Sequence, residues 1–162
     1  MEKLIKILKS RDYTISCMES CTGGLFASEL TNIDGSSEVF KLGIVAYSNE
    51  FKEYFGVNSD TIKKHSVYSN EVSKEMANRV CDIAKSDFGI GITGQLGTKD
   101  IKNNSDNINT VYVSIYDKNK NTFNNYNIEV DGENKFQKKF FVINYIKEKL
   151  YGICKWKAWR IQ

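Results

Sequence analysis

The sequence predicts a single three-layer α/β/α domain with a mixed sheet across residues 1–162. Short apolar runs of strand length alternate with stretches of helical periodicity, a pattern typical of a sheet covered by helices on both faces. Two runs rich in β-formers are joined by the polar segment 117–120, which predicts an antiparallel hairpin beside parallel strands. Neither a repeat nor an interdomain linker interrupts the chain, so we expect one domain.

The first half of the chain begins with apolar residues at helical spacing, Leu4, Ile5 and Leu8, which predict a mature first helix and not a signal peptide. Because the sequence contains no proline, its turns depend on Gly, Asn, Asp and Ser. The first expected elements are a helix over 1–11, a strand over 13–18 and a helix over 25–31. A strand over 39–47 and short helices over 49–55 and 61–64 follow, and Asp60 is expected to cap the last of these.

The second half begins with a long helix capped by Ser69 or Asn70. Its apolar face is expected to comprise Val72, Met76, Val80 and Ile83. The further expected elements are a buried strand over 88–93, a polar loop over 94–109, strands over 110–116 and 121–130, and a helix over 133–150. The basic aromatic tail, 152–162, is expected to pack its tryptophans on the domain or on another subunit.

Composition excludes several classes of function. The net charge of +3 is too small to argue for nucleic-acid binding, and no apolar run approaches the length of a membrane span. The four cysteines include no Cys-x-x-Cys pair, and the single histidine is distant from them in sequence. We therefore expect reduced thiols in a cytoplasmic protein, with no metal and no cofactor. The sequence leaves open whether the chain forms a homo-oligomer.

The most informative segment is Glu-Ser-Cys-Thr-Gly-Gly at 19–24, a tight turn between an expected strand and an expected helix. Unpaired N–H groups at a helix start favour an anion or a developing oxyanion, and Ser20 lies where a nucleophile would be presented. A serine needs a base to take its proton, and either His65 or a lysine with a lowered pKa could serve. Lys52 is the local candidate, because it opens a helix directly after a strand. Cys21 is a weaker alternative nucleophile.

Four motifs occur in the order and at the separations of a known family: residues 19–24, Gly-Ser-Ser at 35–37, Tyr-Ser-Asn-x-x-Lys at 47–52, and Ile-Thr-Gly at 92–94. On these motifs the chain resembles the CinA C-terminal domain family, over about residues 1–150. The enzymatic members of that family are nicotinamide mononucleotide deamidases, and larger members carry an N-terminal domain of a molybdopterin-binding type. The resemblance implies a stand-alone amidohydrolase of pyridine nucleotide salvage.

The resemblance also implies a role for particular residues. It places the nucleophile on Ser20 and the catalytic lysine on Lys52, a serine–lysine dyad that requires no metal. The substrate, a small nucleotide, would be bound by Glu19, Thr22, Gly23, Gly24, Tyr47, Asn49, Thr93 and Gly94. Backbone N–H groups at 21–24 or 93–95 would hold the oxyanion.

Two departures from the family pattern concern substrate recognition. The family usually continues Thr-Gly with Ile-Ala-Gly-Pro and further glycines, whereas this chain has Gln-Leu-Gly-Thr at 95–98, followed by Lys99 and, further on, Lys102. Near residue 132 the family commonly carries two arginines, whereas this chain has Asn134 and Lys138. An alternative is therefore a non-catalytic nucleotide-binding or partner-binding module, and a weaker one is an acyl or phosphoryl transferase.

Overall fold

The computed structural model describes residues 1–97, 99–103 and 108–156. At its centre lies a five-stranded sheet in the order β2-β1-β3-β4-β5. The first three strands in that order are parallel, and the β3–β4 and β4–β5 pairs are antiparallel. The strands are β1 (Ile15–Glu19), β2 (Phe40–Val45), β3 (Phe88–Gly94), β4 (Thr110–Asp117) and β5 (Thr122–Glu129). The predicted mixed sheet and its C-terminal hairpin are confirmed.

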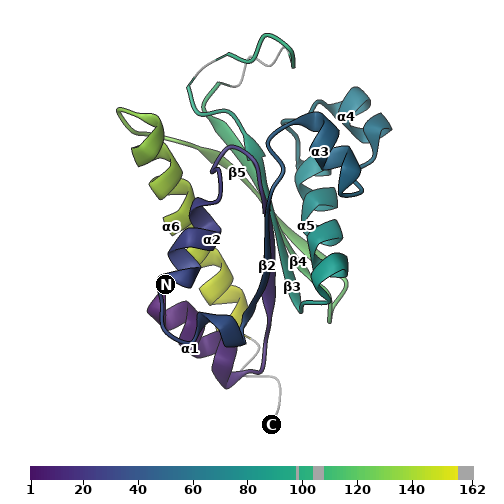
Figure 1. Cartoon of the computed structure of the whole chain (residues 1–162). Helices are drawn as coiled ribbons and strands as arrows, with labels where there is room; N and C mark the ends of the chain where they lie inside the picture. The colour runs from purple at the N-terminus through teal and green to yellow at the C-terminus, as the bar shows by residue number, and fades with distance from the viewer. Residues whose placement is uncertain (98, 104–107, 157–162) are drawn as a thin grey trace.

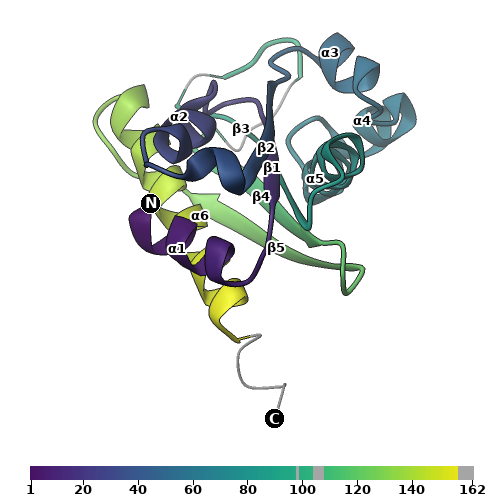
Figure 2. The same cartoon turned by 60° about the horizontal axis from the view of Figure 1, so that its bottom comes forward.

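Helices cover both faces of the sheet. Helices α1, α2 and α6 lie on one face and α3, α4 and α5 on the other, as Figures 1 and 2 show. The helices are α1 (Glu2–Ser10), α2 (Leu25–Thr31), η1 (a 3-10 turn, Ser36–Glu38), α3 (Asn49–Tyr54), α4 (Ser59–His65), α5 (Asn70–Ala84) and α6 (Lys135–Trp156). The three-layer α/β/α class predicted from the alternating pattern is therefore confirmed. Within the described residues, no helix combines the length and apolarity needed to cross a bilayer.

The long helix α5 packs very closely on the central strand β3, which is buried along its whole length. This approach depends on Gly89 and Gly91, where a Cβ atom would overlap the backbone of α5 at Ala77 and Ser73 respectively. The close contact fixes the helix against the strand that leads into the loop after Gly94. Glycine is required here for space rather than for an unusual backbone conformation.

Three details differ from the sequence expectations. Ile83 is 51% exposed, because the buried stripe of α5 continues through Ala77 and Cys81 instead. Helix α4 begins earlier than expected and is capped by Asn58, whose side chain accepts a hydrogen bond from the backbone N–H of Asp60. Helix α6 extends to Trp156, six residues beyond the predicted end. Residues 157–162 of the predicted tail, and residues 98 and 104–107 of the predicted loop, lie outside the described residues.

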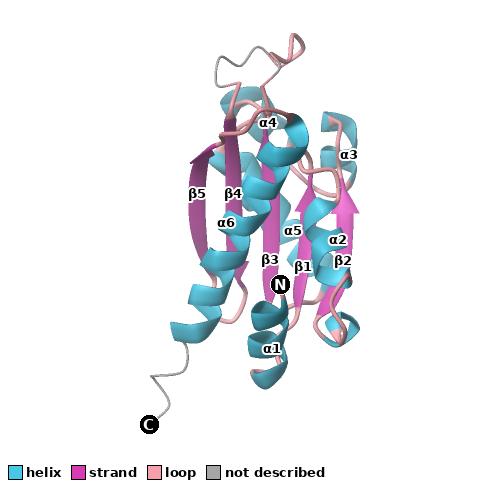
Figure 3. Cartoon of the chain, turned by 90° about the vertical axis from the view of Figure 1, so that its left-hand side faces the viewer, coloured by secondary structure: helices cyan, strands magenta, loops and turns pink. Residues whose placement is uncertain are grey.

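The sheet topology brings three chain segments to one edge. Strands β1, β2 and β3 are parallel, so the segments that follow Glu19, Val45 and Gly94 all leave the sheet at the same end. Figure 3 shows the sheet face on, with these strands side by side. In open α/β sheets this carboxyl end is where ligands bind. The turn 20–24, the segment 46–52 and the loop after β3 are thus placed together.

Candidate active site

Ser20 and Lys52 lie in direct contact at this edge of the sheet. Lys52 Nζ and Ser20 Oγ are 3.0 Å apart, a hydrogen bond between residues that are 32 positions apart in the sequence. Ser20 follows the last residue of β1, and its backbone N–H donates to Ile92 of the neighbouring strand β3. Lys52 lies on α3, a helix that begins after the Ser48 cap, whose hydroxyl accepts from the N–H of Phe51. Tertiary structure therefore joins the two residues of the predicted dyad.

The amine of Lys52 is buried among neutral groups. The residue is 1% exposed, and its Nζ also donates to the carbonyl oxygens of Ala46 at 2.9 Å and Tyr47 at 3.4 Å. No carboxylate is among these hydrogen-bond partners. Burial disfavours the charged ammonium and lowers the pKa of Lys52 from 10.5 to about 8. A buried lysine with such a pKa can exchange a proton with Ser20 near neutral pH.

The turn after Ser20 is held by Glu19 and two glycines. The buried carboxylate of Glu19 accepts hydrogen bonds from the Thr22 hydroxyl and from the backbone N–H groups of Phe26 and Ala27. It therefore satisfies N–H groups at the start of α2 that would otherwise lack partners. Gly23 and Gly24 adopt positive φ angles of 64° and 92°, which other residues rarely adopt.

The same turn presents backbone donors beside the serine. The N–H of Gly23 is used within the turn, donating to the Ser20 carbonyl, and the N–H of Gln95 donates to Thr110. The N–H of Cys21 faces the thiol of the same residue. The N–H of Thr22, in contrast, makes no hydrogen bond within the described part of the chain. A free N–H group just after a nucleophile is placed to receive a developing oxyanion.

Cys21 is poorly suited to replace Ser20 as the nucleophile. Burial raises the pKa of its thiol to about 12, so the reactive thiolate is not formed near neutral pH. The weaker alternative raised by the sequence is therefore disfavoured.

A cavity of about 640 Å³ opens in front of the dyad. Of the residues predicted for the site, Ser20, Lys52, Tyr47, Asn49 and Gly94 line it. The other predicted residues, Glu19, Thr22, Gly23, Gly24 and Thr93, do not line it. Thr93 instead supports the cavity wall, because its hydroxyl donates to the carbonyl of Val67, a lining residue.

Sequence reasoning missed one wall of this cavity. Tyr68 donates to Asp100, Asn103 donates to the same carboxylate, and Asn49 donates to Asn103, so a chain of hydrogen bonds links three separate segments. All four residues line the cavity. No local pattern marks Tyr68, Asp100 or Asn103, because only the folded chain brings the segments before α5 and after β3 together.

The cavity wall carries an excess of positive charge. Besides Lys52 it includes Lys99, Lys102, Lys135 and Lys139, and the amine of Lys139 lies close to Gly23. Lys138, one of the residues weighed for this role from the sequence, is directed elsewhere and donates to Asn109. Asp100 is the acidic residue among those lining the cavity, and its carboxylate is engaged by Tyr68 and Asn103. The site is thus suited to an anionic ligand.

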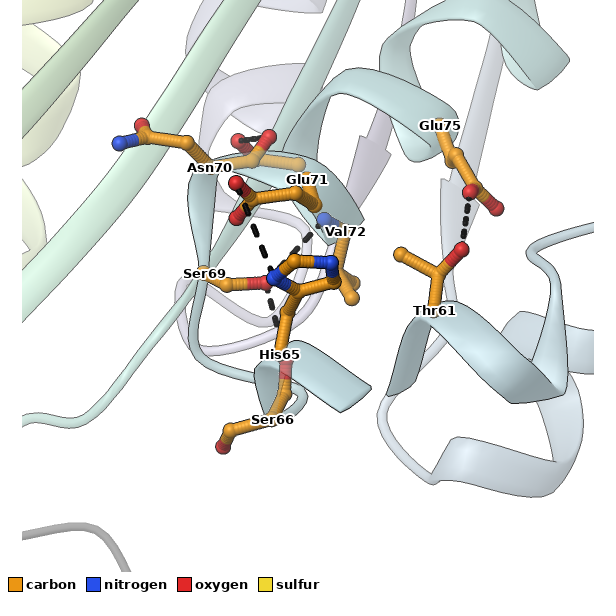
Figure 4. A network of polar contacts seen from close by, with 9 residues as sticks. Thr61, His65, Ser66, Ser69, Asn70, Glu71, Val72 and Glu75 are labelled. Atoms are coloured by element: carbon orange, nitrogen blue, oxygen red, sulfur yellow. Dashed lines mark hydrogen bonds and ion pairs between the residues drawn. The ribbon is translucent and has the colours of Figure 1, made fainter. Parts of the chain in front are cut away.

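His65 lies apart from the site. It is the last residue of α4 and is exposed, and its Nδ1 lies 3.9 Å from the Glu71 carboxylate. Figure 4 shows His65 beside Glu71 at the start of α5. His65 does not line the cavity. Of the two candidate bases, Lys52 and not His65 therefore lies within hydrogen-bonding reach of Ser20. Among the described residues, no group of three His, Cys, Asp or Glu side chains is placed to hold a metal ion.

Comparison with known proteins places the chain in a family. The model of the CinA C-terminal domain matches residues 1–146. A competence-damage inducible protein of Clostridium kluyveri is 45% identical over 118 residues, which are 72% of this chain and 28% of that protein. One from Caldanaerobacter subterraneus subsp. tengcongensis is 48% identical over 97 residues, which are 59% of this chain and 24% of that protein. The chain thus spans about a quarter of the length of these curated relatives.

Solved structures share the fold at low sequence identity. The competence damage-inducible protein A of Klebsiella pneumoniae subsp. pneumoniae superposes with a TM-score of 0.88 at 21% identity, covering 98% of this chain and 96% of that one. A competence/damage inducible protein of Agrobacterium tumefaciens gives a TM-score of 0.85 at 24% identity, covering 93% and 91%. With the family model matching nine-tenths of its length, the chain belongs to the CinA C-terminal domain family.

Proposed function

We propose that this chain is an amidohydrolase that converts the carboxamide of a pyridine nucleotide, of the nicotinamide mononucleotide type, to the acid and ammonia. The observation that supports it most strongly is the buried hydrogen bond between Ser20 and Lys52, whose pKa is lowered to about 8. The deamidase activity of enzymatic members of the resembled family, and the match of their motifs to these two residues, point to the same reaction.

The first half of the reaction forms an acyl-enzyme. Neutral Lys52 takes the proton of Ser20 as Oγ attacks the carboxamide carbon, and the carbonyl oxygen becomes an oxyanion. The free N–H group of Thr22 receives this oxyanion, and a good donor of this kind contributes about 3 kcal/mol. Protonated Lys52 then gives its proton to the departing nitrogen. The C–N bond breaks, ammonia leaves, and Ser20 carries the acyl group as an ester.

The second half regenerates the serine. Lys52, neutral again, takes a proton from water as the water oxygen attacks the ester carbon. The second oxyanion collapses, the bond to Ser20 Oγ breaks, and Lys52 returns its proton to that oxygen. The product is the free acid, and one water molecule has been consumed for each ammonia released.

Burial of Lys52 determines how much enzyme is ready to react. With a pKa of about 8, about one tenth of the lysine is neutral at pH 7, whereas a pKa of 10.5 would leave only about one part in 3,000. The folded structure therefore raises the population of the competent base roughly 300-fold. This gain comes from desolvation and needs no second titrating group.

The lysines of the cavity wall suit the phosphate of a mononucleotide. Lys135 and Lys139, on the first turns of α6, line the same cavity as the dyad. Ammonium groups bind phosphate as point charges and lack the paired geometry of a guanidinium. We infer that they replace the arginines that the family commonly carries near this position.

The test is ammonia release from nicotinamide mononucleotide by the wild type and by the Ser20→Ala and Lys52→Met variants. We expect the wild type to release ammonia and each variant to lose at least about a thousandfold in kcat. Cys21→Ala is the matched control and should stay active, because its thiol is not a nucleophile here. Equal rates in all four proteins would refute the dyad. Nucleotide binding without turnover in the wild type would instead favour the non-catalytic module.

A further inference from the structure

Gln95 is a buried side chain whose hydrogen-bonding groups are unused. It directly follows β3 and is 4% exposed. Its backbone N–H donates to the carbonyl of Thr110, which anchors the residue. The side-chain atoms Oε1 and Nε2 are both buried, and neither makes a hydrogen bond of good geometry within the described part of the chain. The amide lies beside the Tyr68 hydroxyl, whose own hydrogen is donated to Asp100. A donor and an acceptor are therefore buried together without a well-formed hydrogen bond.

Such an arrangement is unusual, because buried polar atoms in native proteins are nearly always paired. Polar neighbours in the same cavity follow that rule, as the hydrogen bonds joining Tyr68, Asp100 and Asn103 illustrate. Gln95 lines the cavity that also contains Ser20 and Lys52. Only its weak contact with the Tyr68 hydroxyl holds the amide in place, so rotation about its side-chain torsions toward the cavity breaks no well-formed hydrogen bond. The unused groups are thus available to a ligand.

We propose that Gln95 is a specificity-determining residue that receives the carboxamide of the substrate. This inference rests on the proposed function. A carboxamide presents an N–H donor beside a carbonyl acceptor, and the Gln95 amide presents the complementary pair. Oε1 accepts from the substrate N–H₂, and Nε2 donates to the substrate carbonyl oxygen.

The same pairing discriminates against the acid. A carboxylate has no N–H to donate, and its negative oxygen would face the Oε1 acceptor of Gln95. Sites built to hydrogen-bond a polar group strongly reject an analogue that lacks it. Gln95 therefore favours the amide substrate over the acid product, which assists product release. It orients the reacting group and takes no proton itself.

Binding is measured in the Ser20→Ala background, so that turnover cannot alter the ligand. Isothermal titration with nicotinamide mononucleotide and with the corresponding acid, nicotinic acid mononucleotide, gives the preference directly. We expect the amide to bind at least about tenfold more tightly. Adding Gln95→Met, which keeps an unbranched side chain of similar length, should bring the two affinities within about threefold, mainly by weakening the amide.

Leu96→Met is the matched control. Leu96 is the adjacent residue, lines the same cavity and is 7% exposed, and the change conserves its apolar character. It should keep the preference for the amide. Gln95→Glu supplies a second variant of the same shape that accepts but does not donate when ionised, and it should also lose the preference.

A stability measurement separates recognition from a merely structural role. A buried amide without a well-formed hydrogen bond gains little stability for the fold, so Gln95→Met should melt at or above the wild-type temperature while it loses the preference. A lower melting temperature with the preference intact would show that Gln95 serves the fold and would overturn the proposal. Absence of any amide preference in Ser20→Ala itself would overturn it as well.

The outcomes also separate this inference from the proposed function. Suppose that the wild type releases no ammonia while Gln95→Met abolishes the tighter binding of the amide nucleotide. In that case the hydrolase proposal is refuted, and the role of Gln95 in recognising the carboxamide is supported. If the wild type is active and Gln95→Met retains the full preference, the hydrolase proposal stands and the role of Gln95 is refuted.

Discussion

Replacing Lys52 by methionine should change how the free energy of unfolding depends on pH. In the folded protein burial lowers the pKa of this lysine to about 8, whereas in the unfolded chain it returns to 10.5. Below pH 8 both states bind the proton, and the folded state bears the full cost of the buried charge. Between pH 8 and 10.5 the unfolded state alone retains the proton. Stability therefore rises with pH across this window and gains nothing more above it.

The magnitude follows from the two pKa values. A fall from 10.5 to about 8 corresponds to about 3 kcal/mol at the acid limit, at about 1.36 kcal/mol for each pH unit. Because the residue is 1% exposed, solvent screening reduces this figure little. Between pH 7 and pH 9 the wild type should regain about 1 kcal/mol of this cost. The Lys52→Met variant also loses the three hydrogen bonds of Nζ. This loss changes the free energy of unfolding by an amount that does not vary with pH.

Urea denaturation of both proteins at pH 7, 8 and 9 measures the effect. We expect the difference in unfolding free energy, wild type minus Lys52→Met, to rise by about 1 kcal/mol from pH 7 to pH 9. Taking the difference cancels the thiols and phenols that titrate in both proteins. Lys63→Met, at a 75% exposed side chain, controls for the change in net charge. A difference that stays constant with pH would refute the argument that burial lowers the pKa of Lys52.

The remaining predictions concern turnover, recognition and packing. The rate of ammonia release should rise with pH to half its maximum near pH 8, and a flat profile would exclude Lys52 as the base. Lys139→Met should raise KM about tenfold for nicotinamide mononucleotide but not for the nucleoside without phosphate, whereas Lys138→Met, outside the cavity, should change neither. Gly91→Ala should destabilise by at least about 2 kcal/mol in urea denaturation, because its Cβ would overlap α5, whereas Gly152→Ala, with open space around it, should not.

The extent to which sequence anticipated the structure differs between the elements and the site. The run over 88–93 and the periodicity after Ser69 identified β3 and α5, because buried strands and amphipathic helices have patterns that depend on local spacing. The prediction that Ile83 lies on the buried face is wrong. Near the end of a helix, the neighbouring elements decide which side chains are buried, and the sequence of the helix does not specify those neighbours. Glu19, a predicted substrate contact, instead caps the start of α2.

The sequence by itself determined the fold class, the strand–turn–helix that presents Ser20, and the motif that contains Lys52, because each depends on residues close together in the chain. Tertiary structure decided that their side chains meet at 3.0 Å, since three parallel strands end at one edge of the sheet. It also decided the burial that lowers the pKa of Lys52 and the unpaired amide of Gln95. Desolvation and hydrogen-bond pairing depend on every neighbour in space, and no local sequence pattern specifies those neighbours.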